Sequence, residues 1–248
     1  HWPEVMVAYE KTEKILFSAD GFGKFGALDS EDDEGWACEA RRYYFNIVGK
    51  YGPFVQHLLK KAASVPITTF CPLHGPVWRK DLKYYIDKHD KWSRYEPEEK
   101  GVLIVYASMY GNTEKTAQTL ATALCERGIT KTAVYDVSDT DVSYLIAEAF
   151  KYSHIVLASP TYNLNIYPKM YDFLHHLKAL NFQKRTFGII ENGTWAIKSG
   201  SLMKEFIEEE LKECLVLSAQ VSVNSSPNES NMKEIEALAD SLTESLKK

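Results

Sequence analysis

The feature that most constrains this chain is an uninterrupted apolar segment, residues 102–107 (VLIVYA), followed at once by a loop rich in hydroxyl groups. An apolar, β-branched run without polar residues is typical of a strand that is buried on both faces of a parallel sheet. The residues that follow, 112–127, have the spacing of a helix. The sequence therefore predicts a strand, a tight turn and a helix, and a sheet with helices on both faces.

The turn at residues 108–113 (SMYGNT) has the composition of an anion-binding site. Ser108, Tyr110 and Thr113 supply hydroxyl groups, Gly111 permits a sharp bend, and the first N–H groups of the helix open into the loop. The loop has neither the lysine of a G-x-x-x-x-G-K-[ST] sequence nor the G-x-G-x-x-G of a dinucleotide turn. One terminal phosphate therefore suits it better than a nucleoside triphosphate with Mg²⁺.

After residue 101, strand and helix patterns alternate five times. Strands are expected at 102–107, 132–137, 154–159, 185–190 and 215–223, and helices at 112–127, 141–152, 168–180, 199–213 and 231–247. This order predicts an α/β fold with a doubly wound, five-stranded parallel sheet. Right-handed crossovers bring the carboxyl ends of the first, third and fourth strands together at the switch point, where such sheets bind ligands. Loops 158–165 and 191–196 should therefore join loop 108–113 in one site, with Tyr162 and Trp195 as rings that can stack on a planar ligand.

The first part of the chain predicts a smaller set of elements. A hairpin is expected at 5–9 and 14–18, helices at 36–51 and 53–63 with a break at Gly52-Pro53, a strand at 66–70 and a helix at 81–93. Residues 29–34 are mostly acidic and are interpreted as a solvated loop, and residues 96–100 as the linker to the second part. Three short sequences of this part contain a His or an Asp at a strand end or in a loop, namely residues 1–4 (HWPE), 18–23 (SADGFG) and 74–79 (HGPVWR).

These segments resemble known sequences. Loop 108–113 is similar to the flavodoxin phosphate loop, [ST]-x-[TY]-G-x-T. Residues 158–163 (ASPTYN) resemble the A-S-P-T-x-N loop of flavodiiron proteins. Residues 191–196 (ENGTWA) look, more loosely, like the G-[SY]-x-G-W loop of the same family. The three short sequences of the first part resemble, in order, the last three ligand segments of the family's metallo-β-lactamase-like domain. The chain is thus similar to the C-terminal portion of a flavodiiron protein. The resemblance implies part of a metallo-β-lactamase-like αββα domain at 1–96 and a flavodoxin-like domain at 101–248.

The resemblance also implies cofactors and a function. FMN is expected against the residues of the three loops, namely Ser108, Met109, Tyr110, Gly111, Asn112, Thr113, Ser159, Pro160, Thr161, Tyr162, Asn163, Glu191, Asn192, Gly193, Thr194 and Trp195. Iron is expected at His1, Asp20 and His74, whose imidazole and carboxylate groups suit that metal. The implied activity is electron transfer from FMN to a diiron centre that reduces dioxygen to water, nitric oxide to nitrous oxide, or both. The implied partners are rubredoxin or a flavin reductase as electron donor and a second copy of the chain in a head-to-tail dimer.

One motif of the family is missing from this sequence. The first ligand cluster, H-x-E-x-D-H, precedes the segment matched by His1 in the family, and the 248 residues contain no such sequence. We therefore expect this chain to hold FMN but little iron. Two other classes stay open: an FMN-binding electron carrier whose metal domain does not function, and a zinc hydrolase, which is disfavoured because hydrolysis has no use for FMN.

Composition excludes several function classes. A net charge of −5 and a pI near 5.9 give no reason to expect a nucleic acid or an anionic membrane as partner. The sequence has no apolar run long enough for a membrane span and no secretory segment, so a soluble, cytoplasmic protein is expected. The four cysteines stand far apart, which predicts free thiols and no CxxC metal or redox motif. Because the sequence begins at His1 without methionine, we expect a processed start or the later part of a longer protein.

Overall fold

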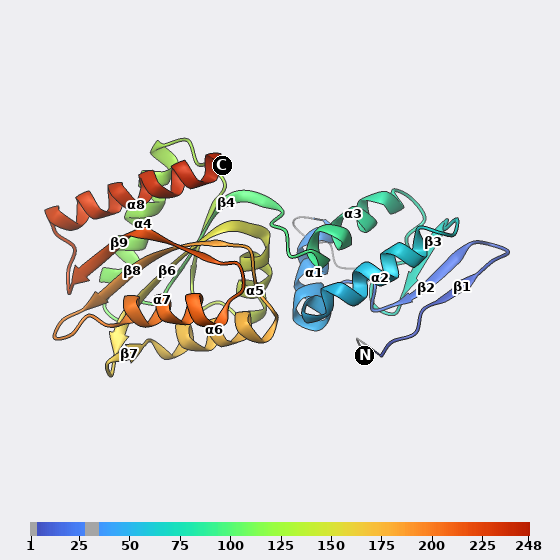
Figure 1. The fold of residues 1–248 in the computed structure, drawn as a ribbon, viewed down its shortest axis with the longest axis horizontal. Coiled ribbons are helices and arrows are strands. Elements are labelled where there is room, and N and C mark those ends of the chain that lie inside the picture. The colour runs from blue at the N-terminus through green and yellow to red at the C-terminus, as the bar shows by residue number, and fades with distance from the viewer. Residues whose placement is uncertain (1–3, 28–34) are drawn as a thin grey trace. The chain divides into compact units, whose positions relative to one another are not determined.

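The computed structural model describes residues 4–27 and 35–248. The chain divides into two compact units, His1–Glu96 and Pro97–Lys248, and each has a hydrophobic core of its own (Figure 1). The predicted metal ligand His1 and the acidic segment 29–34 lie outside the described residues.

The second unit is built on a sheet of five parallel strands. Their order in space is β5-β4-β6-β8-β9, and the short β7 pairs antiparallel with the end of β6. The strands are β4 (Glu99–Tyr106), β5 (Thr132–Asp136), β6 (Tyr152–Tyr162), β7 (Asn165–Ile166), β8 (Thr186–Gly193) and β9 (Leu215–Asn224). This is the doubly wound α/β sheet that the sequence predicts, with the first strand in its interior.

Helices cover both faces of this sheet (Figure 1). They are α4 (Asn112–Glu126), α5 (Val142–Lys151), α6 (Pro168–Ala179), α7 (Ser199–Glu210) and α8 (Glu229–Lys247). On one face α4 and α8 pack through Leu120, Leu124, Leu238 and Leu242 against side chains such as Ile104 of the interior strand β4. The remaining three helices lie on the opposite face (Figure 1). The apolar pattern of residues 102–106 of β4 follows from this arrangement, because both faces of the strand are covered there.

Strand β6 is longer than the sequence pattern predicts. It was expected to end at residue 159 but continues to Tyr162, because Pro160 still pairs with Asn192 of β8 and Tyr162 pairs with Asn165 of β7. Asn163 and Leu164 form the hairpin tip between β6 and β7 with positive φ angles of 48° and 59°. Part of the predicted cofactor loop is therefore strand, and its side chains alternate between two directions.

The first unit has a three-stranded sheet covered by helices. Strands β1 (Ala8–Glu10) and β2 (Ile15–Ala19) form the expected antiparallel hairpin, and β3 (Thr69–Pro72) pairs parallel with β2. Leu16, Phe22 and Phe70 form its buried core. Because β2 and β3 run in the same direction, the loops that follow them, which contain Asp20 and His74, leave the sheet at the same edge.

The helical segment that follows differs in detail from the sequence expectation. The predicted helix 36–51 is α1 (Trp36–Tyr43), then a π-helical turn η1 (Tyr44–Val48), then a 3₁₀ turn η2 (Gly49–Tyr51), and α2 (Gly52–Ala62) follows directly. Gly52-Pro53 is therefore the start of a helix and not a break, in keeping with the tolerance of a first helical turn for proline. Helix α3 (Leu82–Ser93) follows β3.

A buried histidine lies at the centre of the aromatic core of the first unit. His89 of α3 accepts a hydrogen bond at Nε2 from the N–H of Phe22, 3.1 Å away, and its Nδ1 lies 3.0 Å from the carbonyl oxygen of Tyr85. The rings of Trp36 and Trp92 lie within 6 Å of it. Burial lowers the pKa of His89 to about 4, so the ring is neutral at pH 7.

Two further expectations concern cysteines and membrane spans. All four cysteines lie within the described residues, and all are free thiols, as predicted. Among residues 4–27 and 35–248, no helix combines the length and the apolarity that crossing a bilayer requires.

Candidate functional site: a cleft at the carboxyl ends of the parallel strands

The loop after β4 forms the first wall of the site. Gly111 has a φ of +83°, a conformation that favours glycine, and nothing lies within 4 Å of the place where its side chain would be. The N–H of Gly111 donates to Oγ of Ser108 across 3.1 Å, which closes the turn. Helix α4 begins at the next residue, Asn112. The N–H groups of its first turn have no acceptor within the helix, and they open at this end of the sheet.

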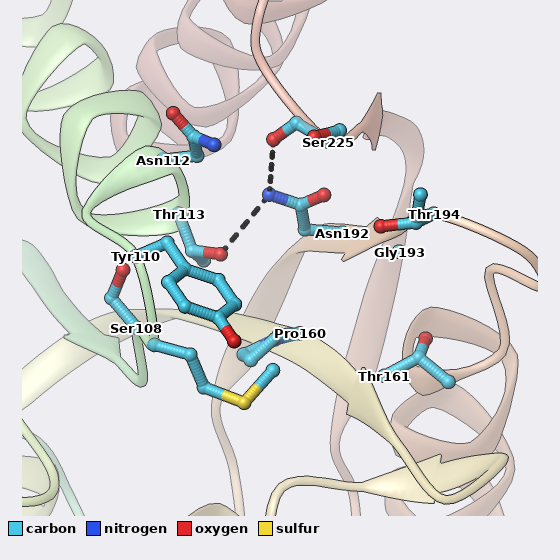
Figure 2. A pocket seen from close by; sticks show the side chains of 11 residues that line it. Ser108, Tyr110, Asn112, Thr113, Pro160, Thr161, Asn192, Gly193, Thr194 and Ser225 are labelled. Carbon is cyan, nitrogen blue, oxygen red and sulfur yellow. Dashed lines mark hydrogen bonds between the residues drawn. The ribbon is translucent and has the colours of Figure 1, made fainter.

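This loop borders a cavity of about 90 Å³ at the carboxyl ends of β4, β6, β8 and β9 (Figure 2). The lining residues are Ser108, Met109, Tyr110, Asn112, Thr113, Pro160, Thr161, Asn192, Gly193, Thr194 and Ser225. The structure therefore brings together the three predicted loops and a fourth segment at Ser225, all far apart in the sequence. None of these eleven lining residues carries a charged side chain, and hydroxyl and amide groups predominate.

Asn192 connects the walls of the cavity. Its Nδ2 donates to Oγ1 of Thr113 across 3.3 Å and to the carbonyl oxygen of Ser225 across 3.1 Å, as the dashed lines of Figure 2 show. Thr113 and Asn192 are both nearly buried, with 2% and 6% of their surface exposed. Strand β8 thus holds the first turn of α4 on one side and the loop after β9 on the other.

Ser225 lines the cavity but was not among the predicted residues. Its φ is +65°, and its N–H donates to the carbonyl oxygen of Gly193 across 3.0 Å. The sequence contained a signal for it, because residues 224–228 (NSSPN) form a turn at the carboxyl end of the fifth predicted strand. The sequence places the switch point at the ends of the first, third and fourth strands, and the end of the fifth strand was therefore not expected in the site.

Six of the predicted cofactor residues do not line the cavity. Gly111 shapes the turn, Asn163 lies at the hairpin tip, and Ser159 is buried, with its Oγ donating to the carbonyl oxygen of Pro160. Tyr162 and Trp195 are 42% and 98% exposed, so neither ring is part of the core. Each directly follows a cavity-lining residue in the sequence, Thr161 and Thr194 respectively.

Glu191, the sixth of these residues, points to the opposite face of the sheet from Asn192, because neighbouring residues of a strand alternate. Its carboxylate accepts hydrogen bonds from the N–H of Gly200, from Nε2 of Gln220 and from Oγ of Ser222, at 2.9, 2.7 and 2.9 Å. Glu191 is nearly buried. It therefore fixes the start of α7 and contributes a negative charge behind the cavity.

Thr161 also contacts α7. Its Oγ1 accepts hydrogen bonds from the N–H groups of Lys198 and Ser199, at 2.9 and 3.1 Å. These are donors at the beginning of the helix that have no partner within it. The loop between β8 and α7, which includes Trp195, is thus anchored at its α7 end by Thr161 of β6.

The first unit brings two of the three predicted metal ligands near each other. Asp20 and His74 follow the adjacent parallel strands β2 and β3, and Tyr43 contacts both: its hydroxyl donates to Oδ1 of Asp20 across 3.0 Å, and its ring centroid lies 5.5 Å from that of His74. The N–H of Lys24 donates to the carbonyl oxygen of His74 across 3.4 Å. Within the described ranges, no three His, Cys, Asp or Glu side chains are grouped so that they could hold a metal ion. The described residues therefore do not form a complete metal site.

Comparisons with known proteins agree with this geometry. The flavodoxin domain family matches residues 103–222. A nitric oxide reductase of Moorella thermoacetica is 31% identical over 223 residues, which are 86% of this chain and 53% of that protein. The structure of the rubredoxin:oxygen oxidoreductase of Desulfovibrio gigas superposes with a TM-score of 0.89 at 26% identity and covers 100% of this chain and 63% of that one. The flavodiiron protein of Giardia intestinalis has the same fold, with a TM-score of 0.90 at 23% identity over 99% of this chain and 62% of that one.

The chain belongs to the flavodiiron protein family. The agreement extends over both units, since the flavodiiron structures match 99% or more of the chain. The flavodoxin domain and the flavodiiron relatives support FMN and iron as cofactors of the family. The chain spans about half the length of the curated relatives that it matches.

The residues of the cleft suit FMN. A phosphate group needs donors, and the cavity offers hydroxyl groups, an amide and the N-terminus of α4, with no carboxylate among the lining side chains to repel it. The predicted iron site differs, because Asp20 and His74 are the two predicted ligands among the described residues, and no group of three such side chains is found there.

Proposed function

We propose that the second unit binds FMN, with the phosphate against the first turn of α4 and the flavin ring beside the loops that follow β6 and β8. The observation that carries this proposal is the cavity at the carboxyl ends of the parallel strands, lined by uncharged donors and bordered by exposed aromatic rings. Of the predicted cofactor residues that line the cavity, all but Asn192, whose amide donates to Thr113 and Ser225, would contact FMN directly. Gly111, Ser159 and Glu191 would support the loops from behind.

Bound FMN can accept two electrons from a donor and release them one at a time. The residues of the chain would bind and orient it. Hydroxyl and N–H groups at Ser108, Thr113 and the start of α4 would hold the phosphate. Tyr162 and Trp195 would cover the ring and keep water from part of its surface.

We further propose that the protein to which this chain corresponds is a flavodiiron oxidoreductase that reduces dioxygen, nitric oxide or both. The names of the Moorella and Desulfovibrio relatives support these two substrates, and the second name supports rubredoxin as the donor, with a flavin reductase as the alternative. In this proposal residues 1–96 are the C-terminal part of a metallo-β-lactamase-like domain, with His1, Asp20 and His74 as iron ligands. Two copies would pair head to tail.

A second candidate function is that of an FMN-binding electron carrier. It is favoured for this chain alone because the 248 residues contain no H-x-E-x-D-H sequence, which leaves His1, Asp20 and His74 as the predicted ligands. A site with so few protein donors leaves most coordination positions to water, which weakens iron binding.

One experiment separates the two functions. The chain is reconstituted with FMN and Fe²⁺ without oxygen, desalted and analysed for both cofactors, and its consumption of O₂ and NO is compared with that of free FMN. We expect FMN near one per chain, little iron, and gas consumption no faster than that of free flavin. The same measurements on a chain extended upstream by an H-x-E-x-D-H segment should show iron and gas reduction, and His74→Ala in the longer protein should abolish both. Near-stoichiometric iron in the 248-residue chain would contradict the electron-carrier function for that chain.

A further inference from the structure

The amide of Asn192 is the one side chain in Figure 2 that joins cavity walls from three parts of the sequence. It stands at the carboxyl end of β8, next to Pro160 of β6 on one side and Val223 of β9 on the other. The two residues that accept its hydrogen bonds, Thr113 and Ser225, are 79 and 33 positions away along the chain. Asn192 is therefore placed to fix the start of α4 relative to the loop after β9, two segments that no common helix or strand connects.

The direction of the hydrogen bond between Asn192 and Thr113 determines whether the Thr113 hydroxyl can donate to a ligand. A threonine hydroxyl has one hydrogen and two lone pairs. Because Oγ1 of Thr113 accepts from Nδ2 of Asn192, its own hydrogen is left for an acceptor elsewhere. Thr113 lines the cavity and belongs to the first turn of α4. Its hydroxyl is thus turned into a donor at the place where the N–H groups of that helix also favour an anion.

The second hydrogen bond holds a backbone that is otherwise unfavourable. Ser225 has a φ of +65°, which costs free energy for a residue other than glycine. Two contacts hold it, one from Nδ2 of Asn192 to its carbonyl oxygen and one from its own N–H to the carbonyl oxygen of Gly193. Both contacts come from the end of β8. The loop after β9 is therefore fixed against the cavity by the same strand end that orients Thr113.

We propose that Asn192 is a positioning residue for a phosphate monoester: it makes Thr113 a hydrogen-bond donor and holds Ser225 as a fourth wall on the phosphate side of the cleft. This inference rests on the proposed binding of FMN and goes beyond it, because it assigns the selectivity for the phosphate group to an amide that orients its neighbours. A carboxylate at this position would reverse the effect. It would accept the hydrogen of Thr113, offer none to Ser225, and add a negative charge.

The test uses two flavins that differ only in the phosphate. Dissociation constants of FMN and riboflavin are measured by quenching of flavin fluorescence for the wild-type chain, Asn192→Asp and Asn192→Ala. We expect Asn192→Asp to weaken FMN at least about tenfold, as loss of a hydrogen bond to a charged group does, and Asn192→Ala to weaken it less. Riboflavin affinity should change by less than about twofold in both, because riboflavin has no phosphate to lose contact with.

A matched variant controls for the added charge. Asn224→Asp places the same carboxylate on an exposed neighbour of Ser225 for which the structure shows no side-chain hydrogen bond among the described residues, and it should leave FMN affinity within about twofold of wild type. Equal loss of FMN and riboflavin in the Asn192 variants would overturn the positioning role, and so would unchanged FMN affinity. Failure of the wild-type chain to bind FMN at all would instead overturn the proposed function on which this inference rests.

Discussion

The hydroxyl of Tyr43 donates a hydrogen bond to Oδ1 of Asp20 across 3.0 Å, and this contact ties the end of α1 to the loop after β2. Asp20 is only 4% exposed. Burial and the negative charge of Asp20 raise the pKa of the Tyr43 phenol well above its usual value. Tyr43 therefore remains protonated and a donor over the whole neutral range, and the carboxylate keeps this partner.

Tyr43→Phe should lower the free energy of unfolding of the first unit by about 1–3 kcal/mol, because a buried carboxylate loses a donor. Urea unfolding followed by tryptophan fluorescence measures this, since Trp36 and Trp92 are buried in that unit. Tyr84→Phe is the matched control, because Tyr84 is 43% exposed, and it should change stability by less than about 0.5 kcal/mol. Equal effects of the two substitutions would show that the contact to Asp20 does not stabilise the loop.

Acid should destabilise the first unit through His89. Its pKa is lowered to about 4 in the folded chain, whereas an unfolded histidine titrates near 6.5. The unfolded state therefore binds the proton first as the pH falls. The stability that His89 contributes is complete above pH 6.5 and is lost progressively toward pH 4, by as much as about 3 kcal/mol.

The pH dependence can be assigned with two variants. His89→Gln should flatten the loss of stability between pH 6.5 and 4, measured by urea unfolding at several pH values. His57→Gln replaces an exposed histidine of α2 and should keep the wild-type profile. A wild-type profile in His89→Gln would mean that other groups cause the acid sensitivity.

Thr113→Ala should weaken FMN binding by roughly 1–2 kcal/mol, because it removes a hydroxyl from the phosphate side of the cavity. Flavin fluorescence titration measures the change. Thr122→Ala is made on the exposed side of the same helix and should leave the affinity unchanged. FMN affinity that stays at the wild-type level in Thr113→Ala would remove the phosphate assignment from this turn.

Glu191→Gln should raise the midpoint potential of bound FMN. The carboxylate is a fixed negative charge behind the cavity and disfavours the extra negative charge of reduced flavin. Spectroelectrochemical titration of the two reconstituted proteins provides the comparison. Glu208→Gln, which neutralises an exposed residue near the end of α7, serves as the reference and should not shift the potential. A potential that is unchanged or lower in Glu191→Gln would contradict a charge effect on the flavin.

Much of the second unit could be predicted because its elements have strong local signals. The apolar run of β4 and the glycine before α4 mark a buried strand and a turn, and the helix begins at residue 112 as expected. The last residue of strand β6 could not be predicted from its own sequence pattern. Its last residues are strand only because β8 and β7 pair with them, and such pairing is not visible in the local sequence.

In the site, too, features set by the local sequence could be predicted, and features set by distant residues could not. The phosphate turn follows from residues 108–113 alone, since a strand end and a helix start define it. The direction of Glu191 was missed because it depends on the register of β8 against β9, in which Glu191 pairs with Ser222. The position of Ser225 depends on its hydrogen bonds to Asn192 and Gly193, which the fold brings beside it. Because side chains alternate between the two faces of a strand, Asn192 lines the cavity and its neighbour Glu191 does not.

We expect one FMN to bind in the cleft with its phosphate at the turn before α4, and a calorimetric titration of wild type and Ser108→Asp measures this. Aspartate can still accept the hydrogen bond that Oγ of Ser108 receives from the N–H of Gly111, so the turn should persist, but it adds a negative charge to the cavity wall. Isothermal titration calorimetry should show one FMN per wild-type chain, and binding weakened at least about tenfold in Ser108→Asp, because two like charges would face each other in a partly buried site. Absence of FMN binding to the wild-type chain, or equal affinity in both proteins, would contradict the binding of an FMN phosphate at this turn.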